Sequence, residues 1–151
     1  MLEVYFKLLN DVTDISALRQ WQCSWLEGQW LAKQKVLVAL DAAELNAFDR
    51  LLWVFKDAAV VPHTIVERPA EFKALNEDYP IGLIDVKLLE ASQKLIGSAN
   101  WILNDSLEAV PASLPGKVLE PVPNIASFKE RQRQRYRDYC AKKIKPQMLG
   151  A

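Results

Sequence analysis

The spacing of apolar residues predicts β-strands along the chain. Over residues 2–9, Val4, Phe6 and Leu8 occupy every second position, which is the period of a strand with one buried face. The run KVLVAL at 35–40 is apolar and rich in β-branched residues, which is typical of a strand buried on both faces. Further strands are predicted at residues 80–86, 101–104 and 117–120, followed by an extended Pro121-Val-Pro123 segment.

Helices are predicted between these strands. A long helix at 15–33 has Asp14 as its N-cap and carries a tryptophan-rich stripe that we expect to pack in the core. A capping box of Asp41 and Glu44 predicts a second helix that ends near Trp53. A short helical segment is expected at 87–96, a loop at 64–79, and a final helix at about 125–143 with Asn124 as its N-cap.

Strand and helix alternate through most of the sequence, and this order predicts an α/β fold with a mostly parallel, doubly wound central sheet flanked by helices. The length of 151 residues is that of one domain, so residues 1–151 are expected to form a single unit. Half of the residues are hydrophobic and a quarter are charged, as in ordinary globular proteins.

The sequence lacks the motifs of nucleotide enzymes. The first predicted strand is followed by NDVTDIS rather than by a Gly-x-Gly-x-x-Gly turn, and no phosphate-binding loop occurs. No Cys/His cluster has the spacing of metal ligands. The single histidine, His63, follows Pro62 in a turn and is expected to pack there rather than to act as a general base. We therefore expect no cofactor, no metal and no intrinsic catalysis.

Cysteine use and hydropathy indicate a cytoplasmic protein. Cys23 and Cys140 lie far apart in the sequence and are expected to be reduced thiols. No apolar run approaches the roughly 20 residues needed to span a bilayer. The first residues, MLEVYFKLLND, have neither the basic region nor the cleavage site of a signal peptide.

Charge is unevenly distributed, although the net charge is zero. Residues 129–145 carry eight lysines and arginines against the two acidic residues Glu130 and Asp138. This predicts either an acidic partner for the basic helix or simply a solvated basic surface, and charge alone does not decide between them.

Four segments resemble the chi subunit of bacterial DNA polymerase III, in the same order and over nearly the whole chain. They are VYFKLL at 4–9, KVLVALDAAELNAFDRLLWVFKDAAVVPH at 35–63, NWILND at 100–105, and VPNIASFKERQRQRYRDY at 122–139. The second contains the family's Leu-Asp-x-x-Leu-Trp…Val-Pro-His pattern, with Phe48 in place of the first leucine. The resemblance implies a Rossmann-like fold without a nucleotide site, in an accessory subunit of the clamp-loader assembly.

The resemblance also implies a binding site for the acidic C-terminal tail of single-strand DNA-binding protein, which ends in phenylalanine. The matching positions are Val122, Arg133, Tyr136 and Arg137, where Arg137 replaces the family's usual lysine. Arg133 and Arg137 are four residues apart and share one helix face. Arginine binds a carboxylate through two parallel hydrogen bonds, so the residue types suit an acidic tail.

A second surface is implied for the psi subunit, or for a helicase that competes with psi. It would comprise Trp53, Phe55 and Val60. The family usually has phenylalanine at the position of Val60, and Phe55 is a candidate to compensate for the smaller side chain. Trp53 as a core residue is the competing interpretation. Association with DNA is expected to be indirect.

Two other functions are compatible with the sequence. One is an enzyme that binds a nucleotide or small molecule on a Rossmann-like sheet, which the missing phosphate loops disfavour. The other is direct binding of single-stranded nucleic acid by the basic helix, in which Tyr136 and Tyr139 would stack on bases.

Overall fold

A computed structural model describes residues 1–56 and 60–150. The helices and strands follow one another in the order β1 (Leu2–Leu9), α1 (Ile15–Leu31), β2 (Val36–Leu40), η1 (Ala42–Glu44), α2 (Leu45–Val54), β3 (His63–Ile65), β4 (Ile81–Asp85), η2 (Val86–Ala91), α3 (Gln93–Gly97), β5 (Trp101–Asn104), β6 (Gly116–Pro123), α4 (Ala126–Ala141) and β7 (Gln147–Leu149). Here η marks a 3₁₀ helix.

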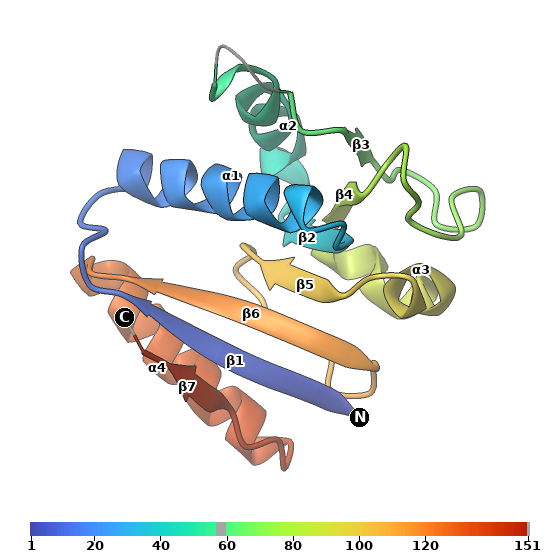
Figure 1. Cartoon of the computed structure of the whole chain (residues 1–151). Helices are drawn as coiled ribbons and strands as arrows, with labels where there is room; N and C mark the ends of the chain where they lie inside the picture. Colours follow the sequence, from blue (N-terminus) through green and yellow to red (C-terminus); the bar gives the residue numbers. More distant parts are fainter. Residues whose placement is uncertain (57–59, 151) are drawn as a thin grey trace.

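The strands form one seven-stranded sheet in the order β3-β4-β2-β5-β6-β1-β7, and every pairing between neighbours is parallel. Helices cover both faces (Figure 1). Helices α1 and α2 pack on one face, while η2, α3 and α4 pack on the other. The predicted α/β class is confirmed, and the sheet is wholly parallel in the described residues.

The central strands are buried on both faces, as the apolar run at 35–40 predicted. All five residues of β2 are buried, because α1 and α2 cover one face of this strand and η2 and α3 the other. In α1, Leu18 and Leu26 are buried, and the tryptophans beside them pack against the core while part of each ring stays accessible. The expected packing role of the stripe is confirmed.

Strand β6 extends further than predicted and includes Pro121 and Pro123. Strand β5 pairs with β6 only at Val118 and Leu119, so the two prolines lie where β1 is the neighbour that β6 pairs with. Proline cannot donate a backbone hydrogen bond, and this position spares the sheet that loss. The segment was correctly predicted to be extended.

Two predicted helix caps are wrong, whereas the cap at Asp14 is confirmed by its 2.7 Å bond from the backbone N–H of Ala17. Asp41 caps no helix with its side chain, and its Oδ2 instead accepts the N–H of Leu107 at 3.0 Å. Helix α4 begins after Ile125 rather than Asn124. The Asn124 amide donates across to the carbonyl of Asn10, because a tertiary contact replaces the local one.

Two edge strands were not predicted. Strand β3 occupies the junction between the turn at Pro62 and the expected loop at 64–79, and β7 follows the basic helix. Each has three residues, too few to show a period of two, and each is defined by its pairing with β4 or β1. Within the described part of the chain, no helix has the length and hydropathy needed to cross a membrane.

Candidate functional site

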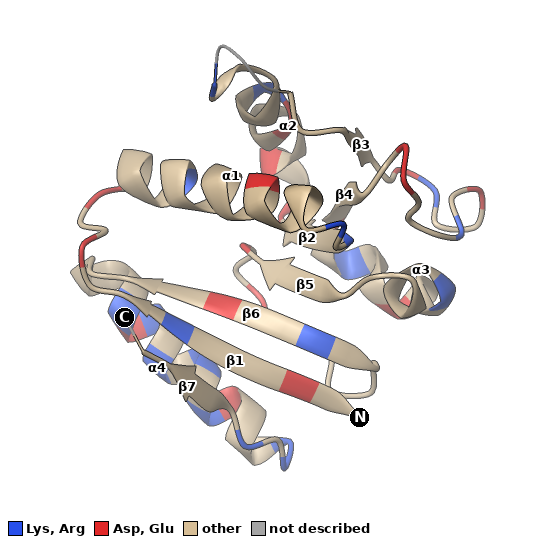
Figure 2. Ribbon diagram, viewed as in Figure 1, with Lys and Arg blue, Asp and Glu red and all other residues tan. Residues whose placement is uncertain are grey.

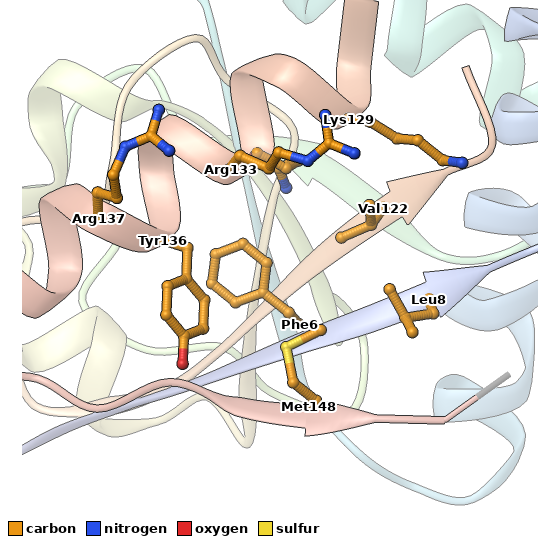
Figure 3. Close-up of a pocket in the computed structure, with 9 residues that line it drawn as sticks. Phe6, Leu8, Val122, Lys129, Arg133, Tyr136, Arg137 and Met148 are labelled. Atoms are coloured by element: carbon orange, nitrogen blue, oxygen red, sulfur yellow. The ribbon is translucent and has the colours of Figure 1, made fainter. Parts of the chain in front are cut away.

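A pocket of about 480 Å³ lies between helix α4 and the three strands β6, β1 and β7. It brings together residues from both ends of the chain (Figure 3). The lining residues are Phe6, Leu8, Val122, Lys129, Gln132, Arg133, Tyr136, Arg137 and Met148. All four residues predicted for the first surface, Val122, Arg133, Tyr136 and Arg137, therefore line one pocket.

The strands supply an apolar wall. Phe6 and Leu8 of β1, Val122 of β6 and Met148 of β7 present hydrophobic side chains to the pocket. The ring of Tyr136 packs edge-on against Phe6 with 5.5 Å between the centroids, a favoured geometry for two aromatic rings. Tyr136 thus separates the apolar wall from the charged helix surface.

Helix α4 supplies the positive side. Lys129, Arg133 and Arg137 occur at intervals of four residues and stand along one helix face. Arg133 pairs with Glu130 on the same helix at 3.4 Å, but both side chains are well exposed. Arg137 donates to Gln134 at 2.9 Å. Exposed pairs of this kind contribute little to stability, so an anionic ligand can compete for both guanidinium groups.

A buried polar network sets the orientation of α4. Glu120 on β6 is fully buried, and its carboxylate accepts hydrogen bonds from Arg135, Gln132 and Tyr139 of α4 at 3.0, 3.1 and 2.7 Å. Asn104 of β5 donates a fourth bond at 2.7 Å. These bonds fix the inward face of α4 on Glu120. With the helix held in this orientation, the face that carries Arg133 and Arg137 borders the pocket.

Because of this network, the basic segment exposes less positive charge than its sequence suggests. Lysines and arginines are prominent along α4 (Figure 2), but Arg135 is buried and neutralised by Glu120. Tyr139 is buried as well, and burial, followed by the nearby Glu120 carboxylate, raises its pKa. Tyr139 therefore has no face available for stacking on a base, which removes one of the two aromatic residues invoked for direct nucleic-acid binding.

Next to the network, charges are partly desolvated at the carboxyl ends of β5 and β6. Burial raises the pKa of Asp105, and its ion pair with Arg19 opposes that shift. Burial and the adjacent Arg135 lower the pKa of Arg131. The space between these groups has almost no free volume and leaves no room for a ligand.

The second predicted surface lies at the end of α2. Trp53 is 53% exposed and Val60 is 44% exposed, while Phe55 is partly buried against the core under α2. The competing interpretation of Trp53 as a core residue is therefore wrong. The adjacent residues 57–59 lie outside the described part of the chain.

His63 packs beneath this surface, as the first residue of strand β3 rather than in the predicted turn. Its ring lies 5.0 Å from that of Trp53, centroid to centroid, and its two nitrogens contact the backbone oxygen of Val61 and the carboxylate of Asp49. Residues 1–56 and 60–150 contain no group of three or more side chains suited to bind a metal ion.

Sequence reasoning missed several pocket residues. Lys129 adds a third cation one turn before Arg133, and the period of four along α4 would have identified it. Met148 was missed because β7 was missed. Phe6 and Leu8 were recognised as alternating strand residues, but the sequence gives no indication that α4 leaves this end of β1 partly open.

Fold and site together define an α/β protein of the Rossmann-like kind, with an apolar pocket bordered by cations and an exposed aromatic surface elsewhere. The chain matches the family model of the DNA polymerase III chi subunit, HolC, over residues 1–147. It therefore belongs to the chi subunit family and is an accessory component of DNA polymerase III. No curated protein sequence matches it.

Proposed function

We propose that this protein is a non-catalytic adaptor in bacterial DNA replication that acts in the cytoplasm. Its pocket binds the acidic, phenylalanine-ending tail of single-strand DNA-binding protein. Its Trp53 surface binds the psi subunit of the clamp loader, or a helicase that competes with psi. The protein would thereby connect the polymerase, or the helicase, to coated single-stranded DNA without contacting the DNA itself.

The observation that carries the proposal is the convergence of Val122, Arg133, Tyr136 and Arg137 on one pocket. A peptide that ends in phenylalanine offers an apolar ring next to a free carboxylate. The strand wall of the pocket suits the ring, and the arginines bind carboxylates through charge-assisted hydrogen bonds. Lys129 extends the positive edge along α4, where preceding aspartates of an extended tail would lie.

Calorimetric titration of the whole protein with synthetic tail peptides tests the pocket. A peptide of aspartates ending in Phe should bind, and the same peptide with a terminal alanine should bind roughly thirtyfold more weakly, since burying a phenylalanine side chain contributes about 2 kcal/mol. Amidation of the terminal carboxylate should also weaken binding. Equal affinity for all three peptides would exclude this site.

The absence of intrinsic catalysis is part of the proposal and has its own test. The connection from β1 to α1, residues 10–14, contains no glycine to cradle a phosphate. Purified protein should hydrolyse neither ATP nor DNA. Turnover that disappears on substitution of a residue of this chain would favour the enzyme interpretation instead.

A further inference from the structure

A second hollow of about 380 Å³ lies on the face of the sheet opposite the pocket beside α4. Figure 1 shows α4 behind β1 and β7, with no helix of the described residues in front of these two strands. Neighbouring side chains of β7 point to opposite faces, because Met148 lines the pocket beside α4 and Leu149 lines the second hollow. The sheet separates the two sites, so both can hold a ligand at the same time.

This second hollow, which we call the tryptophan groove, runs between helix α1 and the strands. Its lining residues are Lys7, Trp21, Trp25, Gln29, Trp101, Leu119 and Leu149. The three residues from α1 recur at intervals of four, so they share one helix face. They span about 12 Å, since a helix rises 1.5 Å per residue.

The strand side of the groove crosses four neighbouring strands. Trp101 begins β5, Leu119 belongs to β6, and Lys7 of β1 is the register partner of Leu149 on β7. The ring of Trp101 meets that of Trp25 edge-on, with 6.2 Å between centroids and 77° between planes. The groove is therefore bounded by indole rings on both the helix side and the strand side.

Aromatic rings, rather than aliphatic side chains, provide the accessible surface. The rings of Trp21 and Trp25 are nearly parallel, with 15° between their planes, and all three groove tryptophans are only partly buried. Leu119 is 3% exposed, so Leu149 is the one aliphatic side chain with appreciable accessible surface in the lining. Each indole also carries one N–H that can donate a hydrogen bond.

These groups suit a particular kind of peptide. A polyproline II segment makes no internal hydrogen bonds, so its carbonyl oxygens are available to indole N–H donors. Proline-rich segments dock in grooves lined by aromatic residues, whereas an amphipathic helix needs a hydrophobic groove for a row of apolar anchors. An added β-strand is also a poor fit, because it pairs at a sheet edge and the groove lies on the face.

One cation borders the groove. The ammonium group of Lys7 donates to the backbone carbonyl of Gly150 at 2.6 Å. An ammonium has three hydrogens, so Lys7 retains donors for a ligand. A carboxylate on the bound peptide would complement this charge.

We propose that the tryptophan groove binds a proline-rich segment of a partner protein in the polyproline II conformation, with an acidic residue near Lys7. The inference goes beyond the proposed function, because neither the pocket beside α4 nor the Trp53 surface includes these tryptophans. At about 3.1 Å per residue, roughly four residues of such a segment span the α1 side of the groove. The segment is extended before it binds, so it loses little conformational entropy.

Nuclear magnetic resonance of the whole ¹⁵N-labelled protein tests the site. The chain has five tryptophans, and each indole N–H gives its own resonance. With a decaproline peptide that has aspartate at each end as probe, the resonances of Trp21, Trp25 and Trp101 should shift to saturation. Those of Trp30 and Trp53, which lie outside the groove lining, should not. No shift, or equal shifts of all five resonances, would overturn the proposal.

Three further probes test the kind of occupant. A glycine-serine peptide of the same length with the same two aspartates matches the charge and lacks the proline rings, so it should not bind. If an amphipathic helical peptide or an oligothymidylate shifts the groove resonances and the proline peptide does not, the occupant is different and the proposal is wrong. Shifts caused by raising the protein concentration alone would assign the groove to a second copy of this chain.

Two substitutions test the contacts. Trp25→Ala should weaken binding of the proline peptide roughly tenfold or more, and Trp30→Ala is the matched control on the same helix. Equal affinity of these two variants would overturn the assignment, and the wild-type resonances still decide if Trp25→Ala fails to fold. Lys7→Gln should weaken binding of the aspartate-flanked peptide about threefold and leave plain decaproline unaffected. An equal effect on both peptides would show that Lys7 does not pair with the acidic residue.

Competition separates this inference from the proposed function. An acidic peptide ending in phenylalanine should leave binding of the proline peptide unchanged, because the two sites lie on opposite faces of the sheet. Displacement of one peptide by the other would contradict a separate groove. Failure of the acidic peptide to bind at all would count against the proposed function and not against the groove.

Discussion

Glu120 on β6 and Arg135 on α4 form a buried ion pair with 3.0 Å between Oε1 and Nη1, and neither side chain is more than 5% exposed. The pair lies next to the pocket, because Gln132 lines the pocket and also donates to Glu120. Arg135 precedes Tyr136, so the residue that anchors α4 to the sheet is adjacent to the residue that lines the pocket.

Arg135→Met should strongly destabilise the protein, because it leaves the Glu120 charge buried without its cation. Breaking a buried pair in this way costs about 3–5 kcal/mol in free energy of unfolding, which urea denaturation measures. Arg133→Met is the matched control on the exposed face of the same helix, and it should change the unfolding free energy by less than about 0.5 kcal/mol. Equal stability of the two variants would mean that Glu120 does not depend on Arg135.

Arg133→Ala should weaken tail-peptide binding by roughly ten- to a hundredfold, because each charge-assisted hydrogen bond contributes about 1.5–3 kcal/mol. The melting temperature should hardly change, and wild-type binding should weaken with added salt because the contact is exposed. Arg68→Ala is a close control: Arg68 is also an exposed arginine paired at i,i+3, with Glu71 at 3.3 Å. Loss of affinity in both variants would indicate a general charge effect.

Trp53→Ala should abolish binding to psi or to the competing helicase and leave the fold intact. Truncating a central interface aromatic commonly costs about 2 kcal/mol or more in binding free energy, whereas a side chain this exposed contributes little to the core. Pull-down and thermal unfolding measure the two effects. Leu107→Ala removes another exposed apolar side chain, on the β5–β6 connection, and should alter neither property. Global unfolding of Trp53→Ala would contradict the surface assignment.

The two thiols should differ sharply in reactivity. Burial raises the pKa of Cys23 to about 11, and Cys140 is exposed. The thiolate is the reactive form, and at about pH 8 the buried thiol has almost none. A thiol reagent should therefore modify Cys140 alone in the folded protein and both residues in urea. Rapid modification of folded Cys140→Ser would show that Cys23 is accessible.

Sequence patterns predicted the longer elements because each carries enough residues to show its period. The eight residues of β1 and the apolar run of β2 are examples. Sequence patterns failed where contacts between distant segments determine the hydrogen-bond partner of a side chain. Asp41 and Asn124 have the side chains of helix caps, yet one bonds to Leu107 and the other to Asn10, partners that lie more than sixty residues away.

The pocket was predicted in part for a related reason. The resemblance to the chi family supplied Arg133, Tyr136 and Arg137, and helical spacing agreed that the two arginines share one face. The charge count over residues 129–145 also grouped Arg135 with the basic segment, because charge in a sequence carries no information about burial. Only the structure shows that a glutamate from strand β6, Glu120, lies beneath Arg135.

The pairing of β1 with β6 and β7 determines when the pocket beside α4 can form. Leu2 is the register partner of Gly116, and Tyr5 is that of Gln147. During synthesis, strand β1 can therefore pair with β6 only after more than a hundred further residues have been made. Pairing between such distant segments is slow to form, so the apolar residues of β1 should be the last part of the sheet to be covered. The newly made chain is most exposed to aggregation at the strand that later forms a wall of the pocket.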